Sequence, residues 1–278
     1  VKTQFHIPDA EMSPKAREII PGHCDQSIFS IMEECSLSTD EEYGLKEFIE
    51  NLGCEYLSTP FSAAAAEILG QFNVNAFKIG SGECNNFHVL NTVSKFNKPL
   101  LISTGMNSLQ SCRDTLNYIK EKSSSEYIFL HTTNLYPTPY HLVRLGGLSE
   151  LQELVGIENV GLSDHTTSNL ACLGAVALGA IVLERHFTDT KEREGPDIIN
   201  SMDPGELKDL REKSQLMYQM RGGSKEFEIV EEQGTRDFAF ATLVAKEPIH
   251  KNQLLTKLNC APQRPAAGDI PASEYYNY

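Results

Sequence analysis

Two histidines occupy corresponding positions in consecutive strand-like segments of this 278-residue chain. Ser163 and His165 share one face of the first segment, and Glu184 and His186 share one face of the next, because side chains alternate along a strand. Consecutive parallel strands lie ~4.8 Å apart, so both imidazoles can reach one divalent cation, for which Mn, Fe, Co or Zn would be suitable. The alternative is that each histidine is only hydrogen-bonded at its strand end.

Lysines and hydroxyls indicate a second kind of chemistry, the binding of an anion. Lys2 and Gln4 share a face of the opening strand, and Lys78 points into the fold if Phe77 and Ile79 point outward. A buried lysine is costly unless it is paired, but beside hydroxyl groups it suits a phosphate or carboxylate. The hydroxyl groups at other strand ends are those of Thr59, Ser81 and Ser103. The alternative is that both lysines lie at the surface with their ammonium groups in water.

Two loops carry further polar side chains. Asn134 and Tyr136 follow the strand-like run 127–132 and suit a ligand that bears hydroxyl or amide groups. They could equally stabilise a turn beside the neighbouring prolines. Asp197 ends a Gly-Pro-Asp turn after the last strand, where it is either a functional acid or an ordinary turn residue.

Short β-rich runs alternate with amphipathic helical stretches, which is typical of a parallel sheet covered by helices. Seven such strand–helix units precede Gly222, and eight would close a barrel of about 250 residues. We therefore predict an α/β fold, a (β/α)8 TIM barrel whose first strand and helix are absent from this chain. An open doubly wound sheet is less favoured because no GxGxxG follows a strand. The runs are 1–5, 55–58, 76–80, 100–104, 127–132, 160–163 and 181–187.

Helix boundaries carry their own signals. Ser38 followed by Glu41 predicts a capping box at the start of one helix. Asn107 is expected to cap the next long helix, and Asp203, followed by a proline, to begin the last one. This last helix should end at Gly222.

The chain should divide into a barrel domain, a linker and a small second domain. The barrel is expected over residues 1–222, and the polar stretch 223–236 is interpreted as a linker. Residues 237–278 are apolar at first and then rich in turns. These ~40 residues are too few for a core that stands alone.

Composition excludes several classes of protein. There are 24 Lys and Arg against 38 Asp and Glu, so the net charge of −14 disfavours nucleic acid and anionic membranes as partners. No apolar run approaches the ~20 residues of a membrane span. Seven cysteines form no CxxC pair, which fits neither a disulfide framework nor a zinc ribbon and favours reduced thiols in the cytoplasm.

Long motifs occur in order along the chain. In the barrel they are STPFS (58–62), KIGSGECNN (78–86), LISTGMNS (101–108), NLYPTPY (134–140), RLGG (144–147), GLSDHT (161–166), ACLGAVALGA (171–180), LERHFT (183–188) and GPD (195–197). In the tail they are DFAFATLVA (237–245) and QRPAAGD (263–269). Together these motifs resemble the bacterial N-acetylneuraminate (sialic acid) synthase family, and the tail resembles the start of the antifreeze-like (SAF) domain that follows the barrel in that family.

This resemblance implies an enzyme that condenses phosphoenolpyruvate with N-acetylmannosamine and releases phosphate by C–O cleavage. His165 and His186 would bind Mn²⁺, or alternatively Mg²⁺ or Co²⁺. Lys78, Asp197 and Glu184 would be catalytic, and Arg264 would reach the N-acetyl group of the sugar within a domain-swapped homodimer. The phosphoenolpyruvate ligands would be Lys2, Thr59, Lys78, Ser81, Ser103, Asn134 and Ser163, and the sugar ligands Gln4, Tyr136 and Asp197.

Two departures from the family pattern stand out. A family glutamate on the first barrel strand has no counterpart, and the antifreeze-like segment stops about halfway. Thr132 also replaces a cysteine found in many members. Two other functions stay open, a related nonulosonate synthase with a legionaminate-type acceptor sugar and a non-catalytic sugar-binding barrel.

Overall fold

The computed structural model describes residues 1–20, 25–195 and 197–277. Cys24 and Pro196 of the Gly-Pro-Asp turn lie outside these residues. The chain divides into two compact units, Val1–Gly222 and Gly223–Tyr278, each of which is described by itself.

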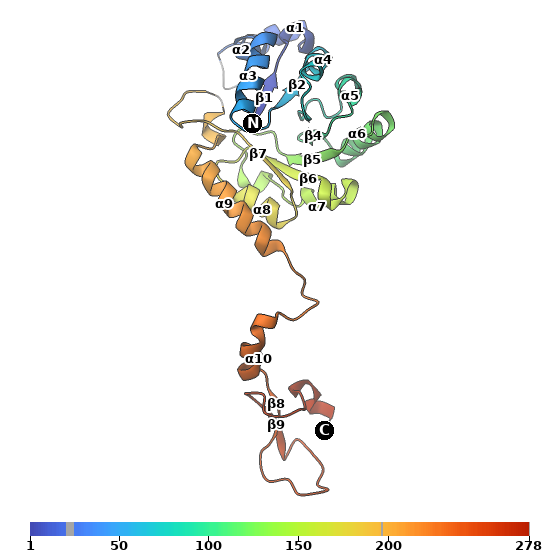
Figure 1. Ribbon diagram of the computed structural model, residues 1–278, viewed down its shortest axis with the longest axis vertical. Helices are drawn as coiled ribbons and strands as arrows, with labels where there is room; N and C mark the ends of the chain where they lie inside the picture. The colour runs from blue at the N-terminus through green and yellow to red at the C-terminus, as the bar shows by residue number, and fades with distance from the viewer. Residues whose placement is uncertain (21–24, 196, 278) are drawn as a thin grey trace. The chain divides into compact units, whose positions relative to one another are not determined.

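The first unit is built on a parallel sheet of seven strands in the order β1 to β7 (Figure 1). Each predicted strand is present, with ends that differ by a few residues. Within the described residues, no further strand pairs with the outer edge of β1 or of β7, so the sheet has seven of the eight strands of a TIM barrel. The strands are β1 Lys2–Phe5, β2 Leu57–Pro60, β3 Phe77–Ile79, β4 Leu100–Ser103, β5 Tyr127–Thr132, β6 Val160–Asp164 and β7 Val182–Arg185.

Helices connect and cover these strands, as the alternating pattern predicted (Figure 1). The longer ones pack on one another and on the sheet, so that each parallel crossover buries its apolar face. The helices of the first unit are α1 Pro8–Glu11, α2 Ile28–Cys35, α3 Thr39–Asn51, α4 Ala63–Gln71, α5 Phe87–Ser94, α6 Leu109–Lys122, α7 Gly147–Val155, α8 Leu170–Ala177 and α9 Pro204–Arg221.

Side chains alternate along each strand, so one face of the sheet packs in the apolar core and the other face does not. Phe77 and Ile79 on β3 are fully buried in the main apolar cluster together with Leu69 of α4. Lys78 between them must therefore point to the opposite side of the sheet. The expected orientation of this lysine is thus confirmed, and the surface alternative for it is excluded because only 3% of Lys78 is exposed.

The helix caps agree with prediction at two of three positions. Ser38 and Glu41 form the capping box of α3, and Asp203 forms one with Glu206 at the start of α9. The prediction for α6 was wrong by one residue, since Ser108 is its N-cap. The Asn107 amide instead donates to the carbonyl oxygens of Ser81 at 2.8 Å and Gly105 at 2.9 Å, so it connects the loops after β3 and β4.

The second unit contains a two-stranded antiparallel sheet of β8 Thr242–Ala245 and β9 Cys260–Gln263. The predicted linker 223–236 is not wholly irregular, because α10 occupies Gln233–Ala239. Within this helix, Gln233 and Asp237, one turn apart, are hydrogen-bonded at 2.7 Å, which adds a small stabilisation. The resemblance of this unit to an antifreeze-like domain stays a prediction. Of the helices described, none has the length and hydrophobicity needed to cross a membrane.

Gly161 of β6 allows β6 and β7 to approach closely, and replacing it should be costly. A Cβ at this position would lie 2.5 Å from the carbonyl oxygen of Val182 and 2.6 Å from a Leu130 methyl carbon. We predict that Gly161→Ala destabilises the protein by about 1–3 kcal/mol in chemical unfolding. Gly44→Ala in α3 is the matched control, because its Cβ meets nothing within 4 Å and alanine favours a helix. Equal unfolding free energies for Gly161→Ala and the native protein would contradict this packing.

Candidate active site

A cavity of about 200 Å³ opens among the strands and the loops that follow them. Because residues of both edge strands, β1 and β7, line it, the sheet must curl around it. Most of the predicted site residues meet here: Lys2, Gln4, Thr59, Lys78, Ser81, Ser103, Asn134, Tyr136, Ser163, His165, Glu184 and His186. Asp197 is not among the lining residues, but it lies beside His186, with its Oδ2 3.4 Å from the His186 Nδ1.

Lys78 is the buried cation of the cavity. Its Nζ donates to Ser103 Oγ at 2.7 Å and to the Ile79 carbonyl oxygen at 3.2 Å, and it lies 3.7 Å from Glu184 Oε2. Burial lowers the pKa of Lys78 to about 8, although the Glu184 carboxylate opposes this change. Lys78 is therefore still protonated near neutral pH and can attract an anion into the cavity.

Glu184, on β7, is the carboxylate that faces the Lys78 ammonium group across the cavity. Burial alone would raise its pKa, but Lys78, Lys2 and a hydrogen bond from Ser163 Oγ at 3.0 Å lower the pKa below its usual value. Glu184 is thus ionised at neutral pH. Lys2 and Lys78 face two carboxyl groups in the cavity, Glu184 and Glu83, of which Glu83 is only partly ionised near pH 7, so the balance stays locally positive in an acidic chain.

His165 and His186 lie face to edge, with ring centroids 5.4 Å apart. His165 Nδ1 lies 2.9 Å from the Thr133 carbonyl oxygen, which can only accept, so Nδ1 carries the proton and Nε2 keeps its lone pair. Burial lowers the pKa of both histidines, which are therefore neutral near pH 7. The Tyr136 ring packs against both imidazoles, with its centroid 4.2 Å from that of His165 and 5.9 Å from that of His186.

This donor set fits a divalent cation in an open site. Neutral imidazoles are the form that binds a metal, and the carboxylate of Asp197 lies beside one of them. Within the described ranges, no group of three or more His, Cys, Asp or Glu residues closes around one point. Two histidines fill only part of a coordination shell, so water or substrate would supply the other ligands of a cation that they hold.

Asn134 presents an unsatisfied acceptor to the cavity. Its Oδ1 is buried without a hydrogen-bond partner. Gly105 leaves room for it, since a Cβ there would lie 2.0 Å from this oxygen. A buried polar atom without a partner is unfavourable, so a donor group of a ligand is the natural partner for Asn134.

Glu83 is a cavity residue to which sequence reasoning gave no role, although its motif KIGSGECNN was singled out. Its Oε2 is buried without a partner, and burial raises the pKa of Glu83 to about 7. Gly80 makes room for it, because a Cβ there would lie 2.6 Å from that oxygen. Its position in the loop that follows the strand of Lys78 was the available signal. A carboxyl group that titrates near neutral pH can hold or move a proton.

Arg264, the predicted contact of the N-acetyl group, lies outside the unit that holds this cavity. It belongs to the second unit and directly follows β9, so its contact with a sugar stays a prediction. Thr132, which replaces a cysteine of the resembled family, does line the cavity.

Comparison with known proteins assigns the chain to a family. Residues 1–226 match the model of the NeuB family. The chain belongs to the NeuB family. Its NeuB-family relatives include the N,N'-diacetyllegionaminic acid synthase of Campylobacter jejuni, which is 32% identical over 91% of this chain and 76% of that protein. The human N-acetylneuraminate-9-phosphate synthase is 33% identical over 79% of this chain and 61% of its own length.

A solved structure supports the fold of this NeuB-family chain. The N-acetylneuraminic acid synthetase of Leptospira borgpetersenii, crystallised with citrate, superposes with a TM-score of 0.76. The match covers 84% of this chain and 78% of the other at 23% identity, so it supports the barrel-like fold alone.

Glu83 should make stability depend on pH. Its pKa is raised in the folded state, so the native protein gains a proton-linked stability below pH 4.5 that is lost as the pH rises through about 7. Glu83→Gln cannot ionise, so its unfolding free energy should not show this loss. We predict that the difference in unfolding free energy, variant minus native protein, increases between pH 4.5 and 7 by at most about 3 kcal/mol. Urea unfolding at a series of pH values measures this difference. A difference that does not change with pH would show that Glu83 titrates normally.

Proposed function

We propose that this protein condenses phosphoenolpyruvate with N-acetylmannosamine to give N-acetylneuraminate and phosphate. The observation that carries the proposal is the buried Lys78, held by Ser103 and Glu184, in the same small cavity as two neutral imidazoles. A cation for an anionic substrate and a pair of metal-binding groups for a carbonyl substrate are what this condensation needs. Membership of the NeuB family supports the same activity.

Phosphoenolpyruvate would bind where the positive charge lies. Lys78 and Lys2 offset the charges of its carboxylate and phosphate groups, and a set of hydroxyl groups and the Asn134 amide donate or accept hydrogen bonds around them. The electrostatic stabilisation is strong because Lys78 is shielded from water and needs no rearrangement. The hydroxyl groups are those of Thr59, Ser81, Ser103 and Ser163.

The proposal includes a divalent ion, Mn²⁺ or alternatively Mg²⁺ or Co²⁺, held by His165 and His186. When bound, such an ion would polarise the aldehyde oxygen of the open-chain sugar and offset the negative charge that develops on it. Gln4, Tyr136 and Asp197 would orient the sugar beside it. Holding the two substrates in line supplies much of the rate, because effective molarities reach ~10⁵ M or more.

The chemistry then joins two carbons and expels phosphate. The methylene carbon of phosphoenolpyruvate forms a bond to the aldehyde carbon as the C=C and C=O π bonds open, and water adds to the carbon that bears phosphate. The C–O bond to phosphate then breaks and leaves a ketone. One proton of the water ends on the former aldehyde oxygen, which becomes a hydroxyl group, and the other leaves with phosphate. Glu83, which titrates near pH 7, takes the proton of the adding water. Lys78 stabilises the negative charge of the departing phosphate, and Glu184 keeps Lys78 in position.

A second acceptor sugar is supported by the comparisons. The Campylobacter jejuni relative that matches 91% of this chain is named N,N'-diacetyllegionaminic acid synthase. A diacetamido-trideoxy-hexose that gives a legionaminate would use the same phosphoenolpyruvate pocket and the same histidines, and would differ only where the sugar contacts the protein. A non-catalytic sugar-binding barrel is the remaining alternative.

The proposal extends to assembly and location. Arg264 of one protomer would reach the N-acetyl group of the sugar bound in the other, within a domain-swapped homodimer. A cytoplasmic location is supported by the cysteine spacing, which is unsuited to a disulfide framework.

The decisive experiment follows phosphate release and product mass. We expect release from phosphoenolpyruvate with N-acetylmannosamine or with the diacetamido sugar, loss of release with EDTA, and its recovery with Mn²⁺. His165→Ala and His186→Ala should each abolish turnover and leave the circular dichroism spectrum unchanged. His88→Ala is the matched control, because His88 is exposed on α5 away from the cavity. Absence of release with both sugars and added metal would refute the synthase proposal in favour of a binding barrel.

The charge of Lys78 should set an alkaline limit on activity. The pKa of Lys78 is about 8, so the ammonium is present below that pH and is lost above it. We predict that kcat/KM for phosphoenolpyruvate, which reports the free enzyme, falls about tenfold per unit above pH 8. Lys78→Arg stays charged throughout this range, so its residual activity should lack the alkaline fall. A native profile that is flat to pH 10 would contradict the role of Lys78.

A further inference from the structure

A buried ion pair lies on the outer side of the strands that carry the two histidines. Asp164 on β6 and Arg185 on β7 are directly opposite in the strand register. Because side chains alternate, they point away from the face that Ser163 and Glu184 present to the cavity. Arg185 Nε lies 3.3 Å from Asp164 Oδ2, and each of these two side chains is only 2% exposed. Neither residue has a part in the chemistry proposed above.

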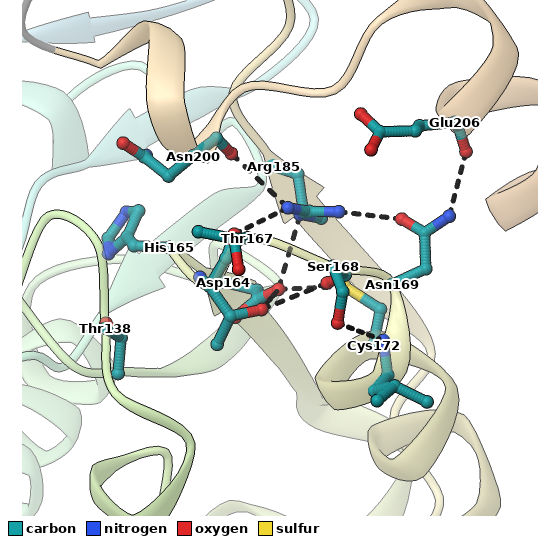
Figure 2. Close-up of polar contacts among 12 residues, drawn as sticks. Thr138, Asp164, His165, Thr167, Ser168, Asn169, Cys172, Arg185, Asn200 and Glu206 are labelled. Atoms are coloured by element: carbon teal, nitrogen blue, oxygen red, sulfur yellow. Dashed lines mark hydrogen bonds and ion pairs between the residues drawn. The ribbon is translucent and has the colours of Figure 1, made fainter.

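The Arg185 guanidinium joins strand β6, the short loop between β6 and α8, and the turn after Asp197 (Figure 2). One terminal nitrogen donates to Asn169 Oδ1 at 2.7 Å, at the residue that precedes α8. The other donates to the carbonyl oxygens of Thr166 at 2.7 Å and Asn200 at 3.3 Å. Asp164 completes the network by accepting from the backbone N–H of Thr166 at 3.0 Å and from its hydroxyl at 2.9 Å.

The segments that Arg185 joins carry His165 or border His186 and Asp197. His165 lies between Asp164 and Thr166, both of which the network holds, and His186 directly follows Arg185. The carbonyl oxygen of Asn200 belongs to the turn that begins after Asp197. Arg185 thus contacts both the loop between β6 and α8, which carries His165, and the turn that follows Asp197.

Stability alone does not explain such a pair. Burying an arginine and a carboxylate carries a large desolvation penalty, and apolar residues of similar size often stabilise a protein as well or better. What the planar guanidinium offers is several hydrogen bonds in fixed directions. This property is useful where the relative position of three segments has to be exact to a fraction of an ångström.

We propose that Arg185, anchored by Asp164, is a positioning residue that sets the separation of His165 and His186 and so the affinity of their divalent-ion site. The inference rests on the proposed function, since it assigns a purpose to the same histidine pair. It concerns residues that contact and orient the metal-binding residues without touching the metal. Substituting such residues typically changes metal affinity 10–100-fold.

The test measures metal binding separately from activity. Arg185→Lys keeps the charge beside Asp164 but cannot bridge the acceptors of Asn169, Thr166 and Asn200 at once. We expect the dissociation constant for Mn²⁺, measured by electron paramagnetic resonance without substrate, to rise about tenfold. Calorimetric binding of phosphoenolpyruvate without metal should be unchanged, because Lys78 and its partners are not disturbed.

A matched control separates positioning from general loss of stability. Glu42 is 1% exposed and accepts hydrogen bonds from Tyr56 and Thr3 in a buried network against β1 and β2. Glu42→Gln should lower the unfolding free energy and leave Mn²⁺ affinity at the native value. If Arg185→Lys does not fold, Asn169→Ala decides, since it removes one of the Arg185 bonds; weaker Mn²⁺ binding with unchanged phosphoenolpyruvate binding supports the proposal.

Three outcomes would overturn the inference. Unchanged Mn²⁺ affinity in the folded variant, while the native protein binds Mn²⁺, refutes the positioning role and leaves the proposed function intact. An equal loss of Mn²⁺ and phosphoenolpyruvate binding shows a general disturbance of the barrel instead. A native protein that binds no Mn²⁺ refutes the metal site of the proposed function and the inference with it.

Discussion

The proposed function depends on keeping one ammonium group, that of Lys78, charged where water is largely excluded. Lys78 lies within a parallel sheet, and burial favours its neutral form. The Glu184 carboxylate reverses enough of this effect for the charge to persist at neutral pH, and Ser103 Oγ accepts a hydrogen bond from the ammonium group. In a chain with a net charge of −14, an anionic substrate is attracted only by such a local arrangement. The curled sheet, the hydroxyl groups and the small cavity volume all serve to place this cation.

Much of the fold and the site could be predicted because periodicity is a local property. The alternation around Lys78 was enough to turn it inward, and matching parity in two consecutive strands brought His165 and His186 together. The capping box at Ser38 depends on residues three apart, so it was equally visible. Asn107 shows the limit, since its amide connects two loops that are distant in sequence, and the adjacent Ser108 caps the helix.

The residues that escaped prediction owe their roles to three-dimensional context. Glu83 looks like an ordinary loop glutamate until burial leaves one of its oxygens without a partner and raises its pKa to about 7. Arg185 resembles any charged residue in a strand until the register places it opposite Asp164. Desolvation and strand register both depend on the whole packed sheet, so no spacing rule within one segment reveals them.

On β6 and β7, one face carries the residues of the cavity and the other carries the ion pair that positions the adjoining loops. Ser163 and Glu184 face the cavity, and Asp164 and Arg185 face the helices behind it, in the same register. A shift of one residue would exchange the two sets and place the guanidinium in the cavity and the ionised Glu184 among apolar side chains. A shift of β7 alone would separate Arg185 from Asp164 and Glu184 from Lys78, so the polar residues on the two faces specify the register together. The site and the structure that positions it are therefore encoded in alternate residues of the same short strands.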